Sequence, residues 1–236
     1  MINHSGKLRN TLHRASNIFI TRSGYERFIF QYPNNQSTNI VIPHGFEQIP
    51  ASLSSKNDKV LKVIAAGRFV AKKGFDDILE AAAQLQKDNF PVQINLFGSG
   101  PLESQLRKKI NDLSLTNTQL IGWTKDLHIE FKKADVFCIP SLEEPFGLII
   151  GEAMMHGLPV ISTRTDGANE IFGTEPERMG AIYVDFSSPD QIKNAIKNIN
   201  NDQKRHLLAN NARSNINKNF SLERLSERLR SLFENA

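Results

Sequence analysis

The sequence predicts an α/β fold with a doubly wound parallel sheet of six strands. Between residues 62 and 184, short β-rich apolar runs alternate with amphipathic stretches, which is typical of βα units sharing one parallel sheet. The chain has 236 residues, 39% of them apolar and 23% charged, so it has the length and composition of a globular protein with one large domain. Disordered and fibrous classes are excluded.

Six runs are expected to form the strands, because each is apolar, rich in β-branched residues and bounded by turn residues. They are residues 63–66, 92–97, 118–121, 136–139, 159–162 and 181–184. Between these strands, apolar residues at helical spacing predict amphipathic helices. The first two helices are expected around Phe75, Ile78, Leu79, Ala82 and Leu85, and around Leu102, Leu106, Ile110 and Leu113.

The ends of the chain are expected to form smaller elements. The N-terminal part predicts a short basic helix, a strand over 18–21, a helix from Ser23, a strand over 39–42 and a turn at 43–45. Residues 51–58, rich in serine and charge, predict a linker. At the other end, Leu222, Leu225, Leu229, Leu232 and Phe233 form the apolar stripe of a last helix, with Ser221 as its expected N-cap. We therefore expect three parts, residues 1–41, 42–219 and 220–236.

Charge and cysteine content narrow the class of protein. The net charge is +4, and the basic excess lies at the two ends of the chain. We interpret these ends as solvated faces and keep contact with an anionic membrane surface as the alternative; no nucleic-acid motif accompanies the charge. The single cysteine, Cys138, lies in an apolar run, which indicates a core residue and a reducing compartment.

The hydropathy pattern predicts a cytoplasmic protein. No apolar stretch approaches the roughly 20 residues of a membrane span, and the first residues lack a basic-then-apolar signal pattern. Peripheral contact with the inner face of the membrane is the alternative location.

Two glutamates flank a predicted helix start. Pro145 disfavours helix at the residue before it, so Glu144 is expected in a loop, a helix is expected to open near Phe146 or Gly147, and Glu152 should lie inside that helix. A helix N-terminus favours an anion, and carboxylates on either side can accept hydrogen bonds from hydroxyl groups. A phosphorylated sugar is the ligand that requires both. The alternative for Glu144, considered without Glu152, is a helix cap or a loop carboxylate that is simply exposed to solvent.

Other candidate residues follow the first three strands. Arg68 and Lys73 come after the first strand, and in a doubly wound sheet the loops at the carboxyl ends of strands form the ligand crevice. Both cations are expected to reach into it and suit a diphosphate. Gly98 and Gly100 form either a turn that lets the backbone approach a ligand or a plain turn, and Trp123 is either a face for a base or a packing residue.

The glycines do not complete a dinucleotide fingerprint. The sixth position of the G-x-G-x-x-G pattern is Glu103, and Pro101 follows the second glycine directly. A site for NAD is therefore poorly supported. No Asp-x-Asp pair is present to hold a metal on a diphosphate, so we expect neither cofactor nor metal.

The ordered motifs resemble the retaining family-4 glycosyltransferases, specifically the C-terminal, nucleotide-sugar-binding domain of their GT-B fold. The resembling segments are 42–46, Gly67-Arg68 with Lys73-Gly74, 98–101, 134–141, 144–154 and 157–161. The resemblance implies a UDP- or GDP-sugar donor, a glycan or lipid-linked acceptor, and α-glycosyl transfer with retention in polysaccharide or lipopolysaccharide synthesis.

The resemblance also implies roles for the candidate residues. Arg68 and Lys73 would hold the donor diphosphate, together with the main chain of Phe146, Gly147 and Leu148. Glu144 would contact the donor sugar as the catalytic-site carboxylate, and Glu152 would bind the ribose hydroxyls. Gly98, Gly100 and Trp123 would form the nucleotide loop.

The chain departs from the family pattern in two respects. Only the last βα unit of the N-terminal acceptor domain is recognisable, so the alternative function is a catalytically silent fragment or one half of a split enzyme that needs a partner chain. Gly151 also stands where the family more often has an apolar residue, and helix propensity predicts a helix weakened by up to about 1 kcal/mol.

Overall fold

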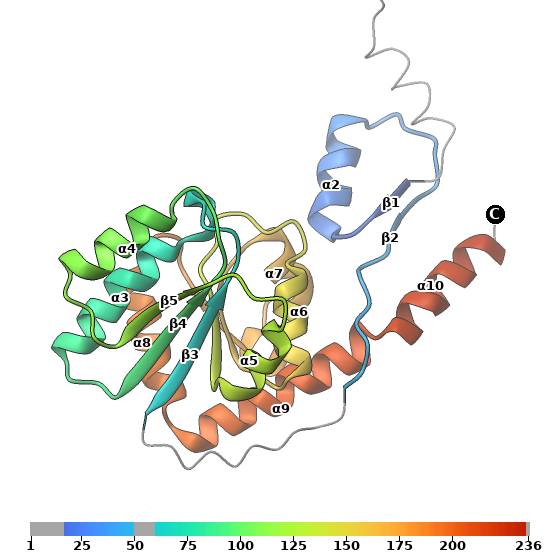
Figure 1. Ribbon diagram of the computed structural model, residues 1–236. Helices are drawn as coiled ribbons and strands as arrows, with labels where there is room; N and C mark the ends of the chain where they lie inside the picture. Colours follow the sequence, from blue (N-terminus) through green and yellow to red (C-terminus); the bar gives the residue numbers. More distant parts are fainter. Residues whose placement is uncertain (1–16, 50–59, 235–236) are drawn as a thin grey trace, which may run out of the picture.

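The computed structural model describes residues 17–49 and 60–234 and contains two parallel sheets (Figure 1). The larger sheet has six parallel strands in the order β5-β4-β3-β6-β7-β8, which confirms the predicted fold class. Its strands are β3 (Leu61–Ala66), β4 (Val92–Phe97), β5 (Thr118–Gly122), β6 (Val136–Ile139), β7 (Val160–Thr163) and β8 (Ala181–Val184). The predicted strands therefore match in number and order.

The strand order reverses direction between β3 and β6. The chain runs from β3 outward through β4 to β5, then returns to the other side of β3 and continues from β6 to β8. At such a switch point, the helices after the two central strands, here α3 (Phe75–Lys87) and α6 (Leu148–Met155), cover opposite faces of the sheet, and a crevice forms at its carboxyl edge. The loops that follow β3 and β6 are therefore placed side by side.

Helices cover both faces of this sheet (Figure 1). One face is covered by α3 (Phe75–Lys87), α4 (Glu103–Asp112) and α8 (Pro189–Ile199), and the other by α5 (Leu127–Lys133), α6 (Leu148–Met155) and α7 (Asp166–Phe172), with α9 (Asp202–Asn219) against α6. Two short 3-10 turns, η1 (Ala71–Lys73) and η2 (Pro176–Met179), complete the domain. The core forms two clusters of buried residues on opposite sides of the strands.

A small N-terminal unit stands beside the top of α7 (Figure 1). It consists of β1 (Asn17–Phe19), α2 (Arg22–Gln31) and β2 (Asn39–Val41), with the two strands paired in parallel. Thr21, expected at the end of the strand, is instead the N-cap of α2, because its hydroxyl accepts a hydrogen bond from the N–H of Gly24 at 3.2 Å. The expected basic helix near the start and the expected linker over 51–58 lie outside the described residues.

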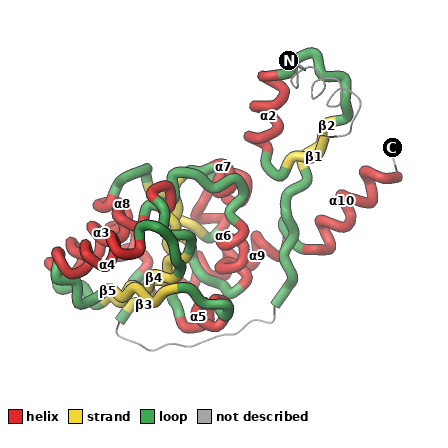
Figure 2. The backbone as a smooth tube through the Cα atoms, turned by 45° about the horizontal axis from the view of Figure 1, so that its top comes forward, coloured by secondary structure: helices red, strands yellow, loops and turns green. Residues whose placement is uncertain are grey.

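The chain enters and leaves the main domain at adjacent points. The N–H of Phe46 donates to the carbonyl of Phe220 at 2.7 Å, and the N–H of Leu222 donates to the carbonyl of Phe46 at 3.0 Å. The last helix, α10 (Leu222–Glu234), starts here with Ser221 as its N-cap, as predicted. Figure 2 shows α10 projecting from the main domain on the side of the N-terminal unit.

The apolar stripe of α10 is incompletely covered in the structure. None of its residues is buried, and Leu222 and Phe233 are largely exposed. Across the described residues, no helix is both long and apolar enough to cross a membrane.

Candidate functional site

A cavity of about 520 Å³ opens at the carboxyl ends of β3, β4 and β5. Its lining includes four of the residues predicted from the sequence, namely Arg68, Gly98, Gly100 and Trp123. Leu127 of α5 and Ile149 of α6, two helices on the same face of the sheet, also line it. The cavity thus lies at the edge that the strand order predicts for a ligand.

Arg68 and Trp123 are both available to a ligand. The Trp123 side chain is 73% exposed although it lies on the cavity wall. Arg68 is also exposed, and in the described part of the chain no carboxylate forms an ion pair with it. An aromatic face and an unpaired guanidinium next to one cavity are complementary to a base and a phosphate.

Gly98 and Gly100 bring the loop after β4 against the loop after β3. A Cβ on Gly98 would lie 1.9 Å from the carbonyl oxygen of Gly67, and one on Gly100 would lie 2.5 Å from that of Phe69. The N–H of Phe69 also donates to Ser99 at 2.9 Å. The two glycines therefore let this loop approach the protein's own main chain beside the cavity. This agrees with the second alternative from the sequence, in which they form a plain turn.

The start of α6 and the loop before it contain main-chain donors that are free of internal acceptors in the part of the chain that the structure describes, although Phe146 and Gly147 are buried. The helix begins at Leu148, and Gly147 precedes it with a left-handed φ of 78°, which glycine adopts without strain. The N–H groups of Phe146, Gly147 and Leu148 have no hydrogen-bond acceptor within the described residues. Because the loop is anchored where Gly167 N–H donates to the carbonyl of Glu144 at 2.8 Å, these donors are held in place.

Lys73 and Glu144 form an ion pair with each other. Glu144 lies in the loop, as expected, but its side chain is only 7% exposed, and the Lys73 ammonium contacts its Oε1. Arg68 therefore lines the cavity as predicted, whereas the ammonium of Lys73 is directed toward Glu144. The cause is the strand order, since β3 and β6 are neighbours and the loops after them meet.

Glu152 lies inside α6, as predicted, and its side chain is accessible to solvent. Partial burial by the surrounding protein raises the pKa of its carboxyl. Ile149, one turn earlier, is the residue of α6 that lines the cavity. The role of Glu152 toward a ribose stays a prediction.

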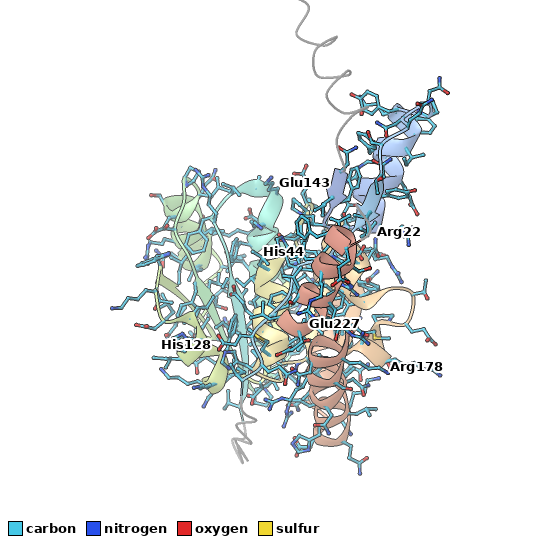
Figure 3. All side chains as sticks on the ribbon, turned by 90° about the vertical axis from the view of Figure 1, so that its right-hand side faces the viewer. Arg22, His44, His128, Glu143, Arg178 and Glu227 are labelled. Carbon is cyan, nitrogen blue, oxygen red and sulfur yellow. The ribbon has the colours of Figure 1, made fainter. Side chains whose placement is uncertain are left out.

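Aromatic side chains around Phe146 were not predicted from the sequence. His44, which is labelled in Figure 3, packs edge-on against the ring of Phe146 at a centroid distance of 4.9 Å. Phe46 and Phe220 lie at centroid distances of 6.3 and 6.2 Å from the same ring. These residues come from the two segments where the chain enters and leaves the domain. Only the tertiary fold joins them, so helical or strand periodicity carries no signal for the cluster.

Comparison with known proteins identifies the family. Residues 47–215 match the family model described as glycosyl transferases group 1. The chain belongs to the group 1 glycosyltransferases.

Relatives of this group 1 glycosyltransferase chain include other glycosyltransferases. The lipopolysaccharide core biosynthesis glycosyltransferase LpsE of Rhizobium meliloti is 32% identical over 167 residues, which cover 70% of this chain and 47% of LpsE. A UDP-Gal:alpha-D-GlcNAc-diphosphoundecaprenol alpha-1,3-galactosyltransferase of Escherichia coli is 27% identical over 71% of this chain and 43% of its own length. The chain spans about half the length of these relatives.

Solved structures confirm the fold. HepE of Anabaena, solved in complex with UDP, superposes with a TM-score of 0.83 at 22% identity. The superposition covers 100% of this chain and 69% of HepE. TarM of Staphylococcus aureus superposes with a TM-score of 0.82 at 22% identity over 92% of this chain and 43% of TarM. The main domain is thus one half of a GT-B fold.

Proposed function

We propose that this chain is the donor-binding part of a glycosyltransferase that uses a UDP- or GDP-sugar. The observation that carries the proposal is the cavity at the carboxyl ends of β3, β4 and β5, whose lining includes both the unpaired Arg68 and the exposed Trp123. A nucleoside diphosphate needs both a cation for its phosphates and a flat face for its base. Family membership gives this cavity its proposed ligand.

The proposed division of roles follows from the chemistry of each group. Arg68 and Lys73 neutralise the diphosphate, and the N–H groups of the loop before α6 bind its oxygens. Glu144 accepts hydrogen bonds from hydroxyls of the donor sugar. Glu152 does the same for the ribose, and Trp123 packs against the base beside the turn of Gly98 and Gly100.

The proposed reaction transfers the sugar with retention to give an α-glycoside. As the bond to the diphosphate breaks, negative charge grows on the leaving oxygen, and fixed cations and main-chain donors stabilise that charge. Arg68 and Lys73 provide the positive charge in this proposal, so no metal ion or cofactor is required.

The relatives suggest the acceptor class and the location. The enzyme names that include lipopolysaccharide core biosynthesis and a diphosphoundecaprenol acceptor support a glycan or lipid-linked acceptor. HepE was solved with UDP and glucose, which supports a nucleotide sugar as donor. We propose that the protein acts in cell-surface polysaccharide or lipopolysaccharide synthesis in the cytoplasm, and peripheral contact with the inner face of the membrane is the alternative location.

A second candidate function is favoured by the uncovered stripe of α10. An apolar helix face of this kind suits docking to another part of the enzyme, so the chain would be a silent fragment or one half of a split enzyme. Sugar transfer or donor hydrolysis by the chain alone contradicts silence. Activity that appears only after an acceptor-domain chain is added supports the split enzyme.

Calorimetric titration with UDP and with GDP tests the leading proposal. We expect one of them to bind, with or without EDTA, because protein cations neutralise the diphosphate. Arg68→Ala should weaken the diphosphate about tenfold and the matching nucleoside much less, because a charge-assisted hydrogen bond contributes about 1.5–3 kcal/mol.

Arg178→Ala is the matched control, since Arg178 is an exposed arginine of η2 that pairs with Glu175, the residue before η2. It should leave both affinities unchanged. Failure of the folded wild-type chain to bind either nucleotide contradicts the proposed function. Equal losses of diphosphate and nucleoside in Arg68→Ala contradict the role of Arg68, and loss of binding in EDTA contradicts the metal-free site.

A further inference from the structure

Ser141 is a fully buried polar residue beside the proposed donor site. It follows β6, its exposed fraction is 0%, and its hydroxyl donates to Oε1 of Glu144 at 2.9 Å. Its carbonyl accepts a hydrogen bond from the hydroxyl of Thr163 at the end of β7. Ser141 is thus held by one strand end and itself holds the carboxylate of Glu144.

The same carboxylate oxygen has a second internal donor. The ammonium of Lys73 also contacts Oε1 of Glu144. Lys73 is brought there by the loop after β3, which is tied to the loop after β6 where the N–H of Leu142 donates to the carbonyl of Lys72 at 2.8 Å. Two donors from different loops therefore converge on one oxygen.

The other carboxylate oxygen of Glu144, Oε2, differs from Oε1 in its hydrogen bonding. Within the described residues, Oε2 has no hydrogen-bond partner, although the side chain as a whole is buried. A buried carboxylate that accepts internal donors on one oxygen has a fixed plane, so the direction in which the second oxygen accepts is fixed too.

We propose that Ser141 is a positioning residue for the donor sugar, which acts through Glu144. Together with Lys73 it occupies Oε1, so Oε2 is the one oxygen of Glu144 that accepts a hydroxyl of the sugar. This inference rests on the proposed function, in which Glu144 contacts the donor sugar. It adds that the Ser141 hydroxyl, which does not touch the ligand, sets the orientation of this contact. The preference among sugars with differently placed hydroxyls therefore depends on Ser141 as well.

The position of Ser141 separates its effect from that of the nucleotide-binding residues. Ser141 does not line the cavity that Arg68 and Trp123 share. Loss of its hydroxyl frees the carboxylate of Glu144 to turn but leaves the cation and the aromatic face unchanged. The sugar part of the binding affinity should therefore fall while the nucleotide part stays.

The test compares Ser141→Ala with the wild-type chain by calorimetry. The probes are UDP against UDP-glucose, UDP-galactose and UDP-N-acetylglucosamine, or GDP against GDP-mannose if GDP binds better. For the sugar that binds best to the wild type, we expect Ser141→Ala to lower the affinity about tenfold, as for one hydrogen bond to a charged group, and to change the affinity for UDP or GDP less than about twofold.

Ser162→Ala is the matched control. Ser162 is also a buried serine, in β7, but its hydroxyl donates to the main-chain carbonyl of Thr163 at 2.9 Å. A general loss of packing or stability would appear in both variants, whereas a changed ratio of nucleotide-sugar to nucleotide affinity should appear only in Ser141→Ala.

Three results overturn the inference. They are equal losses for nucleotide and nucleotide sugar in Ser141→Ala, no loss for either, and a wild-type chain that binds the nucleotide but gains no affinity from any sugar. A wild-type chain that binds no nucleotide overturns the proposed function and this inference with it. If Ser141→Ala does not fold, Thr163→Val, which removes the donor to the Ser141 carbonyl, should show the same selective loss, and its absence there contradicts the proposal.

Discussion

The ring of Phe46 lies directly on the main chain of α6 at Gly151. A Cβ on Gly151 would lie 2.1 Å from Cζ of that ring, closer than any real contact. Gly151 is therefore required for packing, and the weaker helix that its propensity predicts is offset by the aromatic contact. In this way the segment that enters the domain is seated against the helix that carries Glu152.

Gly151→Ala should destabilise the fold by about 1–3 kcal/mol, because the added methyl group overpacks the contact with Phe46. Helix propensity alone predicts the opposite sign, a gain of up to about 1 kcal/mol. Urea denaturation measures the difference. In the background of Phe46→Leu, which shortens the opposing side chain, the penalty should largely disappear. A more stable Gly151→Ala single variant contradicts the packing role.

Among the helices, the end of α6 contains a histidine in an unfavourable place for positive charge. His156 is the C-cap residue and packs against Phe131 of α5 at a centroid distance of 5.6 Å. Burial, together with the charges of Lys132, His128 and Arg213, lowers the pKa of His156 to about 4. His156 therefore has a capping and packing role at this helix end.

Stability should therefore fall at mildly acidic pH. Between the usual histidine pKa near 6.5 and the folded-state value of about 4, the unfolded chain binds a proton that the folded chain does not. The stabilisation that neutral His156 contributes to the free energy of unfolding is therefore complete above pH 6.5. It is lost as the pH falls toward 4, by at most about 1.4 kcal/mol per pH unit.

Calorimetric melting of His156→Gln at pH 7 and pH 5 measures this contribution. The variant should lose less melting temperature between the two values than the wild type, because glutamine carries no proton in either state. His206→Gln changes an exposed histidine of α9 and should behave like the wild type. The same pH dependence in His156→Gln and wild type contradicts the argument.

Element by element, the sheet was predictable and the contacts between loops were not. Each strand of the main domain carries a local apolar signal, and the rule that ligands bind at strand ends found Arg68 and Trp123. The pair of Lys73 and Glu144 joins residues 71 positions apart, and it follows only once β3 and β6 are known to be neighbours. In the sequence, Ser141 stands out only as part of a motif. Its hydrogen bond to Glu144 likewise depends on how the loop after β6 folds, which periodicity does not predict.

At the scale of the whole molecule, ionic contacts attach the N-terminal unit to the main domain. Arg27 of α2 pairs with Asp166 at the start of α7 at 2.7 Å, and the main-chain N–H of Arg22 donates to Glu170 at 2.5 Å. The hydrogen bond from Arg27 lowers the pKa of Asp166, with a smaller contribution from Ser23. These contacts join α2 to α7, and α7 in turn is hydrogen-bonded to the loop of Glu144 through Gly167.

Asp166→Asn should loosen the N-terminal unit while leaving the sheet intact. The pair is largely exposed, so its contribution is at most about 1 kcal/mol, and hydrogen exchange in residues 17–41 should speed up by no more than about fivefold. Mass spectrometry of the exchange measures this. Added salt should reduce the difference between variant and wild type, since it screens the exposed pair. Faster exchange in β3 to β8 as well would contradict a local clamp.

The hydrogen-bonded junction of Phe46 with Phe220 and Leu222 gives the main domain the topology of a closed loop. Both chain crossings pass through one point, so the polypeptide between them can be excised, transplanted or replaced through two neighbouring splice sites. Chimeras joined at this junction should keep the donor preference of the domain they receive. A domain excised at this junction would have its two ends next to each other, so a short linker could join them in a circular permutant.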